Sequence, residues 1–264
     1  MAQSIDLRRE GALAFVTISN SGRLNAMTRA MWRELRAVFE ALPGEAGLRC
    51  VVVSGADGAF CAGGDISEYP SFRFDEARLR EFHEDEVWGG LAAMLACELP
   101  ILARIEGACM GAGIEIASCC DIRLAAASAR FGAPIARLGF PMAPREAALV
   151  QGAIGDVLAR DMLLAAGVHD ARRLYEAGFL LSVLPDAELA AQVQAHALRI
   201  AALAPAAARL NKRSLAALRA AATEAAVAGL LPSAYRYAGG AEHREGVSAF
   251  LAKRAPDFGD IDER

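Results

Sequence analysis

Two glycine-rich segments set the strongest limits on how this chain can fold. Phe60–Ile66 (FCAGGDI) and Glu106–Glu115 (EGACMGAGIE) each follow a strand-like run and precede a helix-like pattern. A strand that turns through small residues into a helix points backbone N–H groups outward, toward a ligand oxygen. Two such turns facing one another would form an oxyanion hole, which stabilises an enolate or a tetrahedral anion. Small residues suit this role because a large side chain would block approach to the backbone.

Strand-like and helix-like patterns alternate along the first part of the chain, which predicts an α/β fold. Apolar and β-branched runs predict strands at Ala12–Ser19, Cys50–Ser54, Ile101–Ile105 and Ile122–Ala127, with Phe131 continuing the series. Thr28 is placed to cap a helix that runs to about Leu42, where Pro43-Gly44 would end it. The polar stretch Glu68–Arg80 is expected to be a mobile loop that enters a helix.

The strand pattern disappears from about Pro185 onward and alanine-rich helical segments follow. We expect helices at Ala187–Ala204, Ala206–Ala222 and Thr223–Leu231. This change of composition is the one internal boundary that we predict. It divides the chain into a core at residues 1–185 and a C-terminal helical region at residues 186–264.

Composition and charge exclude several classes of function. The net charge is −4 and the basic residues are scattered, so no surface for nucleic acid is expected. No apolar run reaches the roughly 18 residues that a membrane helix needs, and the N-terminus does not resemble a signal peptide. Six cysteines without a CxxC pair suggest a reduced, cytoplasmic protein, and the four histidines lack metal-ligand spacing.

A series of short strings resembles the crotonase, or enoyl-CoA hydratase/isomerase, superfamily over nearly the whole chain. Besides the two turns, they are Arg23–Met27 (RLNAM), Cys120–Arg123 (CDIR), Phe131–Pro134 (FGAP) and Glu245–Phe258 (EGVSAFLAKRAPDF). The resemblance implies a spiral core of ββα units with a C-terminal helical trimerisation region. It also implies a homotrimer, or a hexamer made of two trimers, in which the last helices pack on a neighbouring subunit.

The same resemblance implies roles for residues of the two turns. The backbone N–H groups of Gly64 and Ala112 would be the oxyanion donors, and Glu115 would position the water that adds to a double bond. A carboxylate in the small, apolar run around Glu115 is costly unless it is paired or functional, and its pKa is expected to be raised. The alternative is a glutamate favoured at a helix N-terminus by the dipole; we favour the functional interpretation.

A second glutamate of the family's hydratases normally follows the Phe-Gly-x-Pro string, but here that position is Ile135. An isoleucine neither donates nor accepts a proton, so the chain retains one of the two acids. Glu146, further along, is interpreted as a charge at the start of a helix. His83 and Glu84 could reach an acyl pocket, but His83 is interpreted as a solvated residue on a polar helix.

The resemblance also places coenzyme A (CoA), as part of the substrate thioester, along a cleft. The residues implied are Arg23, Leu24, Ala26, Ala62, Asp65 and Ile66, and Lys253 is a candidate for a phosphate of CoA. No other cofactor and no metal is expected. Cys61 is interpreted as a small core residue, because no His–acid partner is evident to activate it. The segment Gly107–Gly113 lacks the spacing of a dinucleotide-binding loop.

Hydration of a trans-2-enoyl-CoA is the function that these features favour. An isomerase, or another lyase of the family that needs a single carboxylate, stays open because of Ile135. A third possibility, from a different class, is an acyl-CoA-binding protein that keeps the cleft and has little catalytic activity.

Overall fold

The computed structural model describes residues 3–45, 47–220 and 235–256, and its main element is a six-stranded sheet. The strands lie in the order β1-β2-β3-β4-β6-β9, with β1 antiparallel to β2 and all other neighbours parallel. Their bounds are β1 Ser4–Glu10, β2 Leu13–Ser19, β3 Cys50–Gly55, β4 Ile101–Ile105, β6 Ile122–Ala126 and β9 Ser182–Leu184. A second sheet of three strands has the order β5-β7-β8, with β5 Ala108–Met110, β7 Arg130–Gly132 and β8 Val168–Asp170.

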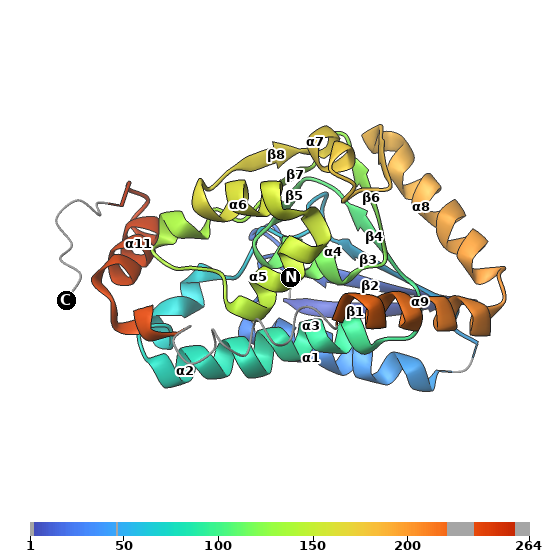
Figure 1. The fold of residues 1–264 in the computed structure, drawn as a ribbon, viewed down its shortest axis with the longest axis horizontal. Coiled ribbons are helices and arrows are strands. Elements are labelled where there is room, and N and C mark those ends of the chain that lie inside the picture. The colour runs from blue at the N-terminus through green and yellow to red at the C-terminus, as the bar shows by residue number, and fades with distance from the viewer. Residues whose placement is uncertain (1–2, 46, 221–234, 257–264) are drawn as a thin grey trace.

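Helices cover the larger sheet and both ends of the molecule (Figure 1). The α-helices are α1 Arg29–Ala41, α2 Glu76–Glu81, α3 Trp88–Ala96, α4 Ala112–Cys119, α5 Pro144–Ile154, α6 Asp156–Leu164, α7 Ala171–Glu176, α8 Asp186–Ala201, α9 Pro205–Ala220 and α11 Ala241–Leu251. The 3₁₀ helices are η1 Leu42–Gly44, η2 Ile66–Ser71, η4 Ile135–Leu138 and η6 Arg236–Gly239, and η3 Phe82–Val87 is a π-helical turn.

The central strands are apolar at most positions because both faces of the sheet are covered. In β3, Val51 and Val53 belong to the main core with α1, whereas Cys50 and Val52 face a second cluster that includes Leu189 of α8. Side chains alternate between the two faces of a strand, so the apolar run Cys50–Val53 fills both cores. This strand carries the chain to the first glycine-rich turn.

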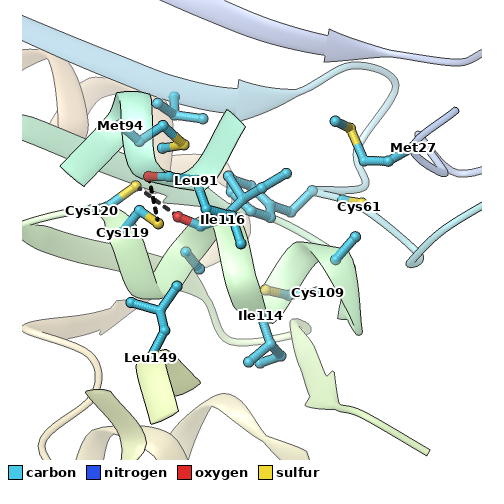
Figure 2. Packing of buried hydrophobic residues seen from close by; sticks show 14 of the residues in the cluster. Met27, Cys61, Leu91, Met94, Cys109, Ile114, Ile116, Cys119, Cys120 and Leu149 are labelled. Atoms are coloured by element: carbon cyan, nitrogen blue, oxygen red, sulfur yellow. Dashed lines mark hydrogen bonds between the residues drawn. The ribbon is translucent and has the colours of Figure 1, made fainter. Parts of the chain in front are cut away.

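The core next to the second turn is built from small and sulfur-containing side chains around α4. Figure 2 shows Cys109, Ile114, Ile116, Cys119 and Cys120 among the buried side chains around α4. The Cys119 thiol donates to the carbonyl of Leu91, and the Cys120 thiol donates to the carbonyl of Ile116. Every residue of α4 is buried, so the helix that carries the second turn is fixed on all sides.

Most predicted elements are confirmed. The four strands predicted from apolar runs correspond to β2, β3, β4 and β6, and Thr28 caps α1 by accepting a hydrogen bond from the Met31 N–H. Two of the three predicted C-terminal helices correspond to α8 and α9, while Thr223–Leu231 lies outside the described residues. In the described part of the chain, no helix is long and apolar enough to cross a bilayer.

The polar stretch from Glu68 to Arg80 enters a helix as predicted, but its first part is a 3₁₀ helix and not a loop. It contains most of η2 and of α2, and Asp65 caps η2 by accepting hydrogen bonds from the N–H and hydroxyl of Ser67. Apolar side chains within the stretch, including Tyr69 and Phe72, are buried in the main core. These anchors hold the polar residues in place.

The C-terminal helix α11 packs on η2 and η4, two segments from the middle of the chain. It packs closely on η4, since a Cβ added to Gly246 would lie 2.1 Å from the carbonyl carbon of Leu138. His243, on the same helix, is buried against Phe74 and Phe140. Figure 1 shows α11 at the end of the molecule where α2 lies, and α8 at the opposite end.

Candidate active site

The first glycine-rich turn leaves the N–H of Gly64 without a partner. On either side of it, the Met27 N–H donates to the Gly63 carbonyl and the Asp65 N–H donates to the Met27 carbonyl, both at 2.8 Å. Backbone groups alternate in direction along an extended chain, so the Gly64 N–H points away from Met27. Among the described residues no acceptor bonds to it. This donor is therefore free to bind a ligand oxygen.

The second turn presents the N–H of Ala112. Gly111 turns the chain from β5 into α4 with a φ of +48°, a conformation that favours glycine. Its N–H donates to the Gly132 carbonyl at 2.9 Å, and its carbonyl accepts from the Glu115 N–H at 3.1 Å. Ala112 begins α4, where the first N–H groups have no acceptor within the helix.

The two turns are in direct contact. The Met110 N–H donates to the Cys61 carbonyl at 2.8 Å, as in neighbouring parallel strands. A Cβ added to Gly111 would lie 3.5 Å from the Cα of Gly63, so the two backbones touch. The structure therefore brings the turns that carry the two predicted oxyanion donors side by side.

The residues implied for CoA come from two segments that also touch. The Ala62 N–H donates to the Leu24 carbonyl at 2.9 Å, and a guanidinium nitrogen of Arg23 lies 3.1 Å from a carboxylate oxygen of Asp65. These contacts gather six of the predicted residues: Arg23, Leu24, Ala26, Ala62, Asp65 and Ile66. Lys253 is exposed after the end of α11, and no contact joins it to this group within the part of the chain that the structure describes.

Glu115 lies in the first turn of α4, close in sequence to the Ala112 donor. Its side chain is buried, and it receives no hydrogen bond from the described residues. Burial raises the pKa of the Glu115 carboxyl well above its usual range; the nearby charge of Glu146 raises it further, and Arg73 opposes the rise. The buried carboxylate predicted from the apolar run is present.

Glu146, in the first turn of α5, is a second buried carboxyl group. It is 1% exposed, and one of its oxygens lies 3.0 Å from Nδ1 of His83. Burial raises the Glu146 pKa to about 8, Glu84 contributes to the rise, and Arg73 opposes it. Burial also lowers the pKa of His83 well below its ordinary value, so the contact is a hydrogen bond to a neutral imidazole.

The interpretations of Glu146 as a helix-end charge and His83 as a solvated residue are corrected here. Glu146 does begin a helix, but its carboxyl faces the interior and His83 is only 7% exposed. Their burial results from packing between segments far apart in the chain, which no local pattern reveals. The sequence signal that could have found Glu146 is weak: it is an acid within the segment expected to shape the acyl pocket.

A π-helical turn positions His83. The turn η3 inserts between α2 and α3, and such insertions occur frequently at functional sites. The His83 ring stacks on Tyr235 with centroids 5.6 Å apart. Tyr235 donates to Glu84, which in turn pairs with Arg145 at 3.1 Å. The imidazole is thus held between the C-terminal part of the chain and α5.

Ile135, at the position of the second glutamate, begins η4 and is partly buried against the main core. Ile135 therefore provides no acid at the position of the second glutamate. No group of three metal-binding side chains occurs within residues 3–45, 47–220 and 235–256. Two hollows of the surface, lined by Arg36 and Gly89 and by Arg49 and Pro205, include neither turn and neither Glu115 nor Glu146; the first is lined by Glu84.

Comparisons with known proteins show the family of the chain. A family model described as enoyl-CoA hydratase/isomerase matches residues 8–261. A probable enoyl-CoA hydratase of Mycobacterium bovis is 29% identical, over 97% of this chain and 98% of the relative. A crotonyl-CoA hydratase of Syntrophomonas wolfei is 28% identical, over 97% and 98% of the two chains.

A solved structure extends the similarity to the fold. The crystal structure of an enoyl-CoA hydratase/carnithine racemase from Magnetospirillum magneticum superposes with a TM-score of 0.80 and 36% identity. The match covers 98% of this chain and 96% of that one. The mixed α/β architecture predicted from the alternating patterns is confirmed.

Proposed function

The chain belongs to the enoyl-CoA hydratase/isomerase family, and we propose that within this family it adds water to a trans-2-enoyl-CoA thioester. The observation that carries the proposal is the buried Glu115 carboxyl, one helical turn from a free backbone donor at Ala112. The relatives named as enoyl-CoA hydratases support the same reaction.

The two free N–H groups would stabilise the charge that develops on the thioester oxygen. When oxygen from water bonds to C3 of the substrate, the electron pair of the double bond moves to the thioester carbonyl and forms an enolate. The N–H groups of Gly64 and Ala112 would bind that oxygen in the transition state. Loss of one such donor typically lowers the rate by about 100- to 1,000-fold.

Glu115 and Glu146 would share the proton handling. Both carboxyl groups are buried near one cation, Arg73, and the charge of Glu146 raises the pKa of Glu115, so ionisation of one carboxyl disfavours ionisation of the other. The ionised Glu115 would take a proton from water as its oxygen attacks C3. A proton then reaches C2 of the enolate, giving a 3-hydroxyacyl-CoA. Glu146, hydrogen-bonded to His83, would hold the second proton and stand in for the acid that Ile135 cannot supply.

The proposal needs no cofactor besides the CoA that the substrate carries. The segments of Arg23–Ala26 and Ala62–Ile66 would hold the CoA part, and Lys253 stays a candidate for a phosphate. We propose a homotrimer or a hexamer as the working assembly, with residues 186–264 as its helical oligomerisation region. Large apolar side chains exposed in that region, at Leu203, Leu210 and Leu215, support this part of the proposal.

An isomerase, or another lyase that uses one carboxylate, is the second candidate function. The observation in its favour is Ile135, because moving a proton from C4 to C2 requires one base at one face of the substrate. Glu115 alone would suffice for that transfer. A protein that only binds acyl-CoA is disfavoured, because two buried and mutually destabilising carboxyl groups are costly to retain without a catalytic use.

Loss of the enoyl-thioester absorbance with crotonyl-CoA tests the hydratase proposal. We expect turnover in the wild type and a loss of about 100- to 10,000-fold in kcat for Glu115→Gln, the range for one general acid–base group. Glu176→Gln, at a half-exposed glutamate of α7, is the matched control and should retain the wild-type rate.

Tight CoA-ester binding without loss of absorbance, across short, long and aryl enoyl-CoAs, would contradict hydration. Exchange of deuterium from solvent into the substrate or a shift of its double bond would then favour the isomerase.

A further inference from the structure

Arg73 is a buried cation that forms no ion pair with a carboxylate among the described residues. It follows η2 and is 1% exposed, one of the largest fully buried side chains in the structure. Its Nε lies 3.4 Å from Nε2 of His243, and one of its terminal nitrogens lies 3.3 Å from the hydroxyl of Tyr237. Among the described residues, no acidic side chain forms an ion pair with it. Buried guanidinium groups are normally paired, because an isolated charge loses its hydration without compensation.

The groups around Arg73 favour a cation but supply no negative charge. Its guanidinium carbon lies 4.3 Å from the ring centroid of Tyr69 and 3.9 Å from that of Phe140, so two aromatic faces enclose it. Burial and the Arg73 charge lower the pKa of His243 to about 4, so this partner is neutral at pH 7. Burial raises the Tyr237 pKa to about 12, so the phenol is neutral too.

Glu115 and Glu146 do not neutralise Arg73 by contact. Both carboxyl groups interact with the Arg73 charge through space, yet burial still holds the pKa of each carboxyl group above its usual range. A carboxylate paired directly with a buried arginine would have a lowered pKa instead. Arg73 therefore has no carboxylate in direct contact among the described residues.

Arg73 is adjacent to the oxyanion donors through one aromatic ring. A Cβ added to Gly64 would lie 2.3 Å from the hydroxyl oxygen of Tyr69, so that hydroxyl sits against the first turn. The Arg73 guanidinium lies over the face of the same tyrosine ring. Tyr69 therefore connects the turn that would bind the thioester oxygen with the Arg73 guanidinium.

We propose that Arg73 binds a carboxylate on the acyl group of the substrate, so that the protein acts on CoA thioesters of dicarboxylic acids. This inference rests on the proposed function, since it requires the thioester to occupy the Gly64 and Ala112 turns. An arginine held in place by Tyr237, His243 and two rings presents a fixed hydrogen-bonding fork to a planar carboxylate. The substrate then supplies the direct ion-pair partner that no described residue gives Arg73.

Binding of two saturated thioesters to the wild-type protein tests the inference without relying on any variant. Glutaryl-CoA and valeryl-CoA have the same number of acyl carbons, but only glutaryl-CoA ends in a carboxylate. Neither has the double bond needed for hydration, so calorimetry measures binding alone. We expect glutaryl-CoA to bind roughly 10- to 100-fold more tightly, the range for a hydrogen bond to a charged group.

Arg73→Met should reduce that preference to about one, while Arg73→Lys should retain part of it. Arg29→Met is the matched control: Arg29 also stacks on a phenylalanine, Phe72, but it already pairs with Glu86. This variant should keep the preference. If Arg73→Met fails to fold, the ratio of the glutaryl-CoA and valeryl-CoA affinities of the wild type still tests the proposal.

Equal binding of the two thioesters by the wild type would overturn the carboxylate site and leave the acyl-CoA proposal intact; Arg73 would then serve only to balance Glu115 and Glu146. Failure to bind either thioester would overturn the proposed function itself, and the inference with it.

Discussion

At the scale of single residues, Glu146 makes the stability of the protein depend on pH. Burial raises its pKa from 4.5 to about 8, so the folded state keeps a proton that the unfolded chain has lost between these values. The contribution is fully favourable below pH 4.5, and it is lost as pH rises toward 8. The free energy of unfolding of the wild type should therefore fall between pH 5 and pH 8.

Urea unfolding of the wild type and of Glu146→Gln at the two pH values checks this. In the variant the fall should be smaller by roughly 1–3 kcal/mol, since one pKa unit corresponds to about 1.4 kcal/mol. His83 titrates in both proteins, so its contribution largely cancels. Equal falls in the two proteins would mean that Glu146 ionises normally in the folded state.

The residues that carry the site were predictable to different degrees. Gly64, Ala112 and Glu115 lie within contiguous strings, so the sequence places them on turns and at the start of a helix. Glu146 and Arg73 were not predictable as buried groups, because each lies among residues that look solvent-exposed. Their burial depends on contacts such as Arg73 with His243, which are 170 positions apart.

At the scale of elements, the packing of η2 against the first turn excludes a side chain at Gly64. In Gly64→Ala the new Cβ would lie 2.3 Å from the Tyr69 hydroxyl oxygen, and either η2 or the turn must move. We expect a loss of about 1–3 kcal/mol of stability, as for other overpacked sites. Activity should fall as well, because the Gly64 N–H is displaced from the thioester oxygen.

The double variant Gly64→Ala/Tyr69→Phe tests whether this contact is the cause. Without the hydroxyl, the nearest ring atom lies 3.3 Å from the new Cβ, so part of the clash is relieved. Thermal unfolding should show a double variant more stable than the sum of the two single changes predicts. Strict additivity would show that the strain arises elsewhere in the turn.

Elements with two buried faces were predictable, and short or exposed ones were not. The runs that form β3 and β4 are apolar at nearly every position, so they stand out in the sequence. The edge strand β1 is mostly exposed and carries charged residues, while β8 and β9 have three residues each. The polar stretch that became η2 and α2 was mistaken for a loop because its buried anchors are few.

At the scale of the whole molecule, the alternating patterns were sufficient to predict an α/β fold, but not the return of α11 to the active-site end. That return brings His243 and Tyr237 to Arg73, and it is fixed by the contact of Gly246 with η4. A composition shift near Pro185 indicates where helices begin, not where they pack. Sequence patterns therefore could not predict the contacts of Arg73 with Tyr237 and His243, which join distant parts of the chain.

The proposed oligomer accounts for apolar side chains that the single chain leaves in water. Leu215 of α9 is 69% exposed, and Val157 and Leu164 are exposed on one side of α6, two turns apart.

Light scattering of the wild type should give a mass of three or six chains. Leu215→Asp should lower the mass toward one chain without loss of helical circular dichroism, because most of the side chain is exposed in the single chain. Arg172→Asp, at an exposed position of α7, should not change the assembly. A wild type that stays monomeric at high concentration, or a Leu215 variant that assembles normally, would show that this face of the C-terminal region does not join the subunits.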